Sequence, residues 1–131
     1  MSLRVLIVDD NAYFLDAARD LLDREGMAVV GVASTVADAI RGADELMADV
    51  ILVDIDLGGE SGIDLTRALT EGRRGGGQQS VILMSAYPKE EFGELIDESP
   101  AVAFLPKSHL SAKAIWDIVG PIVDGGDRAD R

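Results

Sequence analysis

The sequence contains no cysteine and a single histidine, His109, among its 131 residues. The missing thiols exclude disulfides, thiolate nucleophiles and cysteine-based metal sites. Basic residues are also scarce: 12 Lys and Arg stand against 24 Asp and Glu, which gives a formal net charge of -12. Because this charge repels phosphate backbones, we expect no direct binding of nucleic acid by this domain.

Long apolar runs are absent too. The longest, such as 50–53, have the length of a strand and are far too short to cross a bilayer, so we expect no membrane contact. The first residues carry one positive charge and reach Asp9-Asp10 after a short apolar stretch, which is unlike a signal peptide. The chain is therefore expected to begin here and to be cytoplasmic.

Short β-rich segments alternate with segments of helical period along the chain, which is 47% hydrophobic. Strands are expected at 4–8, 27–33, 50–54, 81–85 and 103–106. The first helix is expected at 12–25. The apolar residues that mark the other four are Val36, Ile40, Ala43 and Met47; Leu65, Ala68 and Leu69; Phe92, Leu95 and Ile96; and Ile115, Ile118, Val119, Ile122 and Val123.

The expected strands at 4–8, 50–54 and 81–85 are almost wholly apolar, not alternating. Both faces of these strands must then be covered, which favours a parallel sheet between two helical layers and an α/β fold. We prefer an open doubly wound sheet to a barrel, which usually needs about 250 residues. Residues 72–77 are rich in glycine and predict a linker, and the last helix is expected to end at Val123.

Polar side chains stand where four of these strands end. Asp9-Asp10, Asp54, Ser85 and Lys107 follow or close the strands, and the carboxyl ends of parallel strands meet at one edge of the sheet. Three carboxylates without His or Cys neighbours favour Mg²⁺ or Mn²⁺. Asp54 is the best candidate nucleophile toward a phosphoryl group, because it ends the central strand, while Ser85 and Lys107 can take up charge on phosphoryl oxygens.

Four segments, in this order and at this spacing, resemble the receiver domain of two-component response regulators. These are Val8-Asp9-Asp10-Asn11, Leu52-Val53-Asp54-Ile55-Asp56-Leu57 running into Gly62, Met84-Ser85-Ala86, and Phe104-Leu105-Pro106-Lys107. The resemblance covers essentially the whole chain. It implies a flavodoxin-like three-layer sandwich of five parallel strands in the order 2-1-3-4-5 with five helices.

The resemblance also implies a function. Asp54 would be the phosphoacceptor, taking its phosphoryl group from a sensor histidine kinase or phosphotransfer protein. Mg²⁺ would be held by Asp9, Asp10, Asp54 and the backbone carbonyl of Asp56. Phosphorylation would then move Ser85 and Phe104 and change the surface of the fourth helix, fifth strand and fifth helix, with dimerisation as one outcome. An output domain or target protein would read this change, and the only chemistry would be self-phosphorylation and self-dephosphorylation.

The sequence differs from the pattern of the family after Lys107. Many receivers have a cis proline after the strand-five lysine, but here Ser108 follows Lys107, so we expect a trans bond. The Phe-Leu-Pro-Lys-Ser sequence resembles that of receivers joined to helix-turn-helix domains, which implies a transcriptional output.

Several other residues have a simpler interpretation. Thr35 and Ser61 are expected to cap helices, Gly58-Gly59 to form a flexible loop, and Trp116 to lie off the apolar stripe of its helix. By its neighbourhood alone Phe104 is a core residue, and His109 receives no role.

Two alternative functions stay open. The Asp54-Ile55-Asp56 sequence is also similar to that of haloacid-dehalogenase-like Mg²⁺ phosphohydrolases, although that group places the pair after its first strand. The other alternative is a receiver fold that serves as an interaction module without phosphorylation. We expect one domain over residues 1–123 and a polar tail or linker stub over 124–131.

Overall fold

The computed structural model of the chain describes residues 3–71 and 79–129, with side chains described as far as residue 122. The linker expected at residues 72–77 lies outside this description. No helix in the described ranges is long and apolar enough to cross a bilayer.

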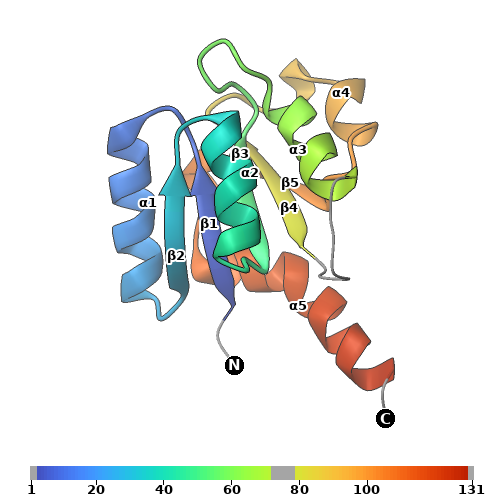
Figure 1. Cartoon of the computed structure of the whole chain (residues 1–131). Helices are drawn as coiled ribbons and strands as arrows, with labels where there is room; N and C mark the ends of the chain where they lie inside the picture. The colour runs from blue at the N-terminus through green and yellow to red at the C-terminus, as the bar shows by residue number, and fades with distance from the viewer. Residues whose placement is uncertain (1–2, 72–78, 130–131) are drawn as a thin grey trace.

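A five-stranded parallel sheet forms the centre of the molecule (Figure 1). Its strands are β1 (Arg4–Val8), β2 (Ala28–Ala33), β3 (Val50–Asp54), β4 (Ser80–Ser85) and β5 (Ala103–Pro106). They lie in the order β2-β1-β3-β4-β5, which confirms the expected topology. The neighbours β1 and β3 are joined in register, with Val8 beside Val53.

Helices cover both faces of the sheet. They are α1 (Ala12–Arg24), α2 (Val36–Glu45), α3 (Gly62–Glu71), α4 (Glu94–Asp97) and α5 (Ala112–Ala129), with one-turn 3-10 helices η1 (Lys89–Glu91) and η2 (Lys107–His109). Buried residues of α1 and α5 belong to one hydrophobic cluster, and those of α2, α3 and α4 belong to the other. Figure 1 shows α2 and α3 in front of the sheet and α5 behind it. The three-layer sandwich is therefore confirmed.

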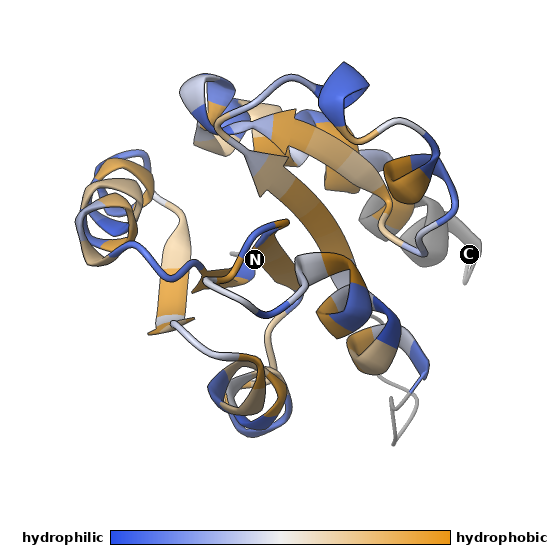
Figure 2. Ribbon diagram, turned by 90° about the horizontal axis from the view of Figure 1, so that it is seen from above, coloured by the Kyte–Doolittle hydropathy of each residue, from blue (hydrophilic) through white to orange (hydrophobic). Residues whose placement is uncertain are grey.

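Two hydrophobic cores explain the apolar strands. In β1, Val5 and Ile7 belong to the α1–α5 cluster, whereas Leu6 and Val8 belong to the cluster under α2, α3 and α4. Successive side chains of a strand point to opposite faces, so a strand covered on both sides needs apolar residues throughout. In Figure 2 the central strands are accordingly hydrophobic along their length, while the helices carry hydrophilic residues.

Polar side chains fix where the helices begin. Thr35 Oγ1 accepts a hydrogen bond from the Asp38 N–H, and Ser61 Oγ accepts one from the Asp64 N–H, as expected for caps. Asn11 caps α1 in the same way, its Oδ1 accepting from the N–H groups of Tyr13 and Phe14. Each cap satisfies backbone donors that the first turn of a helix leaves without partners.

Two apolar residues expected on the buried stripe of α2 lie outside the core. Ile40 is 44% exposed and Met47 is 74% exposed, whereas Ala39 and Ala43 are buried in the core and Val36 packs against it. The helix ends at Glu45, and Met47 adopts a positive φ of 53° in the following turn. The 36–40–43–47 spacing therefore did not describe one helical face, because the helix stops before its last member.

The other helices show similar corrections. Leu95 is exposed because α4 is a single turn, which buries only Ile96. Ala68 of α3 is exposed while Leu65 and Leu69 are buried.

The last helix is longer than expected. Ile115 and Val119 are fully buried and Trp116 is partly exposed off their stripe, as expected, but Ile122 is also exposed. The helix continues to Ala129 and contains Pro121. The expected end at Val123 is wrong because the following glycines lower helix propensity without preventing further hydrogen-bonded turns. The division into domain and tail stays a prediction.

Gly62 connects the sheet to α3 at the end of β3. Its N–H donates to the Ile55 carbonyl over 2.8 Å. A Cβ atom at this position would lie 2.0 Å from the Asp54 carbonyl oxygen, so no larger residue fits without moving the backbone. The close approach of α3 therefore fixes the backbone on which the Asp54 side chain stands.

We predict that Gly62→Ala lowers the free energy of unfolding by about 3 kcal/mol, because the methyl group forces α3 away from β3. Gly42→Ala is the matched control: it lies inside α2, its Cβ would meet nothing closer than 3.6 Å, and the change is expected to stabilise by about 1 kcal/mol. Urea denaturation of both variants measures the difference. Equal stabilities would contradict the steric assignment.

Candidate functional site

The carboxyl edge of the sheet gathers the polar residues that the sequence placed after the strands. Asp9 follows β1, Asp54 and Ser85 are the last residues of β3 and β4, and Lys107 follows β5 directly. Asp54 pairs with Met84 in the register of the sheet, and Ser85 pairs with Pro106. Parallel pairing therefore delivers four chemically active residues to one edge.

Three carboxylates cluster at this edge. Asp9, Asp10 and Asp54 each offer an oxygen within 4.8 Å of the others. Asp9 is fully buried and Asp54 is 7% exposed, whereas Asp10 is exposed. The cluster is therefore open to solvent at Asp10 and enclosed at Asp9 and Asp54.

Lys107 provides the positive charge at the buried side of the cluster. Its Nζ lies 2.5 Å from Asp9 Oδ2 and 3.1 Å from Asp54 Oδ2, and its side chain is only 17% exposed. Lys107 thus forms an ion pair with each of the two buried acids, and its Nζ donates a hydrogen bond to Asp54 Oδ2. One ammonium is thus shared between the two buried carboxylates of the cluster.

Backbone N–H groups orient the two buried carboxylates. Asp9 Oδ1 accepts from the Asn11 N–H at 2.9 Å, and Asp54 Oδ1 accepts from the Asp56 N–H at 3.2 Å. Each carboxylate therefore uses Oδ1 for a local turn and Oδ2 for the ammonium. Both turns join residues two positions apart, so they orient the carboxylates through local bonds.

The loop from β3 to α3 closes over Asp10. Asp56 Oδ1 accepts from the Gly58 N–H, so the Asp56 side chain serves the loop. Gly58 has a φ of 63°, and a Cβ atom there would lie 2.7 Å from Asp10 Oδ2. Gly58 therefore leaves room for the Asp10 carboxylate, whereas a Cβ atom at Gly59 would meet nothing within 4 Å. The Gly58-Gly59 sequence by itself does not indicate which of the two glycines has this steric role.

Ser85 is buried, and its Oγ accepts from the Tyr87 N–H at 2.9 Å. This bond closes a turn after β4. The structure therefore places the hydroxyl at the expected edge of the sheet, and its role toward a phosphoryl group stays a prediction.

Phe104 is half-buried and packs on the cluster under α2, α3 and α4. Its ring lies 6.4 Å from that of Phe92, tilted by 44°. The switch role expected of Phe104 stays a prediction.

His109 is exposed in η2, and no cis peptide occurs among the described residues, which confirms the trans bond expected between Lys107 and Ser108.

One contact could not be found by sequence motifs. Lys107 Nζ lies 4.4 Å from the centroid of the Phe14 ring, in the first turn of α1. In the sequence, Phe14 is one of several apolar residues in the helix expected at 12–25. Its position at the lysine depends on a contact between residues 93 positions apart, which the spacing of apolar residues does not reveal.

Burial, and after it the nearby Asp9 charge, raise the pKa of Asp54 to about 6, although Lys107 and the Asp56 N–H act in the opposite direction. For Lys107, burial acts to lower the pKa, but the Asp9 and Asp54 carboxylates outweigh it and the pKa is raised. At neutral pH the ammonium is therefore fully charged, and Asp54 is mostly ionised but close to its titration range.

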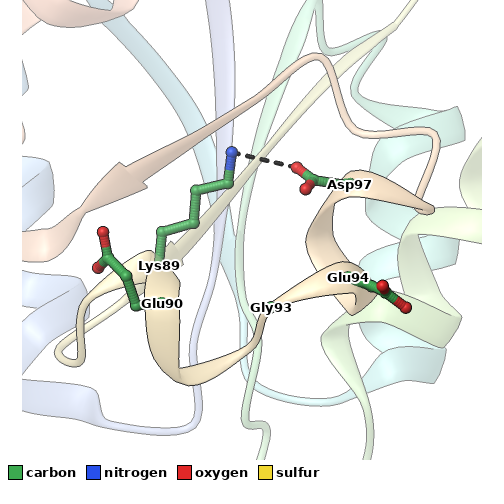
Figure 3. A pocket seen from close by; sticks show the side chains of 5 residues that line it. All are labelled: Lys89, Glu90, Gly93, Glu94 and Asp97. Atoms are coloured by element: carbon green, nitrogen blue, oxygen red, sulfur yellow. Dashed lines mark ion pairs between the residues drawn. The ribbon is translucent and has the colours of Figure 1, made fainter.

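A separate pocket lies beside η1 and α4 and includes none of these residues (Figure 3). Its walls come from Lys89, Glu90, Gly93, Glu94 and Asp97, and the Lys89–Asp97 ion pair, 3.1 Å long, spans it. Both partners of this pair are largely exposed, so the pair contributes little to stability. The pocket is therefore separate from the carboxylate cluster at the sheet edge.

We predict that Asp54→Asn stabilises the protein at pH 7.5 in metal-free buffer by about 1–2 kcal/mol. The folded protein binds the Asp54 proton more tightly than the unfolded chain, because the pKa rises from its ordinary 3.8 to about 6. The free energy of unfolding of the wild type therefore falls as pH rises from 4 through 6, and the uncharged amide avoids this loss. Urea denaturation between pH 4 and 7.5 with chelator tests it; a difference that does not shrink toward pH 4 would refute the assignment.

Comparisons with known proteins agree with this geometry. The family model described as the response regulator receiver domain matches residues 5–118. A protein-glutamate methylesterase/protein-glutamine glutaminase of Myxococcus xanthus is 31% identical over 92% of this chain and 35% of its own length. The nitrate/nitrite response regulator protein NarP of Escherichia coli is 39% identical over 72% of this chain and 43% of its own length. The chain thus spans between a third and a half of these relatives.

Solved structures show the same fold. The crystal structure of a two-component response regulator of the LuxR family, from Aurantimonas sp. SI85-9A1, superposes with a TM-score of 0.77 and 26% identity. The match covers 95% of this chain and 87% of that one. Together with the family match over most of the sequence, this shows that the chain belongs to the response regulator receiver domain family.

Proposed function

We propose that this receiver domain accepts a phosphoryl group on Asp54 from the phosphohistidine of a sensor histidine kinase or phosphotransfer protein, in the cytoplasm. The observation that carries the proposal is the Asp54 carboxylate itself. It is buried, held by the Lys107 ammonium at 3.1 Å, and faces two further carboxylates. A buried carboxylate needs a cationic partner. A purely structural role does not explain why three carboxylates gather at one place.

The residues at this edge fit a divalent cation. Asp9, Asp10 and Asp54 supply hard oxygen ligands, and neither His nor Cys is among the groups that gather there. Asp9 is fully buried, and Asp10 is open to solvent. We propose that these three side chains and the backbone carbonyl of Asp56 hold Mg²⁺ or Mn²⁺. When bound, the cation would neutralise charge on the phosphoryl oxygens.

Asp54 can act as the nucleophile at neutral pH. With a pKa of about 6, the carboxylate is roughly nine-tenths ionised at pH 7. One carboxylate oxygen would form the new P–O bond as the P–N bond to the kinase histidine breaks, and the imidazole leaves with the electron pair. The Asp56 N–H holds Oδ1 during this step.

Lys107 and Ser85 would stabilise the product. The ammonium already lies beside Asp54 Oδ2, so it can pair with a phosphoryl oxygen attached to Asp54. Ser85 Oγ accepts from the Tyr87 N–H, which leaves its own O–H able to donate to a second phosphoryl oxygen. The Ser85 movement and a turn of Phe104 would then change the surface of α4, β5 and α5, with dimerisation as one outcome.

The output of this change is a further part of the proposal. Among the relatives, one is named a methylesterase and glutaminase and another a nitrate/nitrite response regulator. Because this chain spans only part of each, their activities belong to whole proteins, and we propose that a separate output domain or target protein reads the switched surface. We assign no catalysis of external substrates to this domain, and no contact with nucleic acid or membrane.

We predict one added phosphoryl group in the intact mass after incubation with acetyl phosphate and Mg²⁺. Asp54→Asn and excess chelator should each abolish the addition, because they remove the nucleophile and the cation. Lys107→Ala should bind Mg²⁺ but gain the group far more slowly. Normal labelling of Asp54→Asn would overturn the nucleophile assignment, and no labelling of the wild type would favour an interaction module without phosphorylation.

We predict that Gly58→Ala weakens Mg²⁺ binding roughly tenfold, because the new methyl group displaces the Asp10 carboxylate. Gly59→Ala is the matched control: its φ of 100° is also positive, but nothing lies within 4 Å of its Cβ. Both changes strain the backbone, and only the first should alter affinity. Titration calorimetry with MgCl₂ compares them; equal affinities in the two variants would rule out the contact with Asp10.

A further inference from the structure

We propose that Phe14 is a positioning residue for Lys107, whose ring face holds the ammonium against Asp9 and Asp54. This inference rests on the proposed function, because positioning matters for phosphoryl transfer to Asp54. The observation is the 4.4 Å distance between Lys107 Nζ and the centroid of the Phe14 ring. This distance lies well within the range in which an aromatic ring attracts a cation.

The ring is held in place by its own backbone. Phe14 belongs to the first turn of α1, where its N–H donates to Asn11 Oδ1, and its side chain packs on the α1–α5 cluster. The Asn11 N–H in turn donates to Asp9 Oδ1. One short segment, residues 9–14, therefore presents both a carboxylate and an aromatic face to the same ammonium.

An aromatic ring suits this place better than a polar or an aliphatic residue. A carboxylate would add a further negative charge to an acidic cluster and compete for the ammonium protons. An aliphatic side chain would exclude water without attracting the cation. The ring does both, and it leaves the N–H groups of Lys107 for oxygen acceptors.

The contact limits where the lysine can go. Lysine carries its charge on a flexible four-carbon stem, so burial alone does not select one position for the ammonium. With the ring centroid 4.4 Å from Nζ and the Asp9 and Asp54 carboxylates within 3.1 Å of it, Nζ stays where a phosphoryl oxygen on Asp54 would arrive. Loss of the ring should therefore slow phosphorylation and leave the carboxylate ligands of the cation unchanged.

Phe14→Leu, Phe14→Tyr and Tyr13→Leu test this inference. The first removes the aromatic face but keeps apolar bulk, and the second restores the face. The third makes a similar change at the adjacent residue, which is 88% exposed. With acetyl phosphate and saturating Mg²⁺, we expect Phe14→Leu to be phosphorylated roughly three- to tenfold more slowly. Phe14→Tyr and Tyr13→Leu should stay close to the wild-type rate, and Mg²⁺ affinity should be the same in all four proteins.

A second measurement detects the contact without phosphorylation. In the metal-free protein, the ring current of Phe14 should shift the NMR signals of the Lys107 ε-methylene protons upfield, and Phe14→Leu should abolish the shift. A wild-type rate in Phe14→Leu, or an equally slow Phe14→Tyr, would overturn the inference. So would the absence of the upfield shift, whatever the phosphorylation result. Failure of the wild type to be phosphorylated, with the shift present, would instead count against the proposed function.

Discussion

The site depends on one electrostatic arrangement, the ammonium of Lys107 between the buried carboxylates of Asp9 and Asp54. Two carboxylates brought this close in a dry environment repel each other, and removing both from water is costly. The ammonium offsets both effects only because it reaches Oδ2 of each. The three residues stand at the ends of three different strands. The arrangement therefore exists only when β1, β3 and β5 are brought together in one folded sheet.

The surrounding backbone is built to hold this arrangement. Turns after β1 and β3 give each buried carboxylate one N–H donor, so the acidic side chains keep their orientation through local bonds. Glycine appears where the chain must come closest: Gly62 against the Asp54 carbonyl and Gly58 against the Asp10 carboxylate. Core packing on both faces then fixes the strands themselves. The precision of the site thus comes from short-range turns placed on a rigid two-sided sheet.

The parts of the fold that the sequence could predict are those with a local signal. Almost wholly apolar strands indicated a sheet covered on both sides, and capping residues such as Thr35 and Ser61 indicated helix starts. Polar residues at strand ends predicted the carboxylate cluster and its lysine. Met47 was misplaced because apolar spacing does not reveal where a helix ends, and the roles of Gly58 and Phe14 stayed hidden because they depend on distances between segments far apart in sequence.

The choice of lysine at position 107 follows from the same arrangement. An arginine fork binds one carboxylate with two parallel bonds, which suits a fixed pair better than a shared position between two acids. A compact ammonium can bridge Asp9 and Asp54 and can turn toward a third acceptor by rotation about its stem. That freedom is useful only if something limits it. The Phe14 ring, whose centroid lies 4.4 Å from Nζ, would limit it by holding the ammonium beside the oxygen atoms of Asp9 and Asp54.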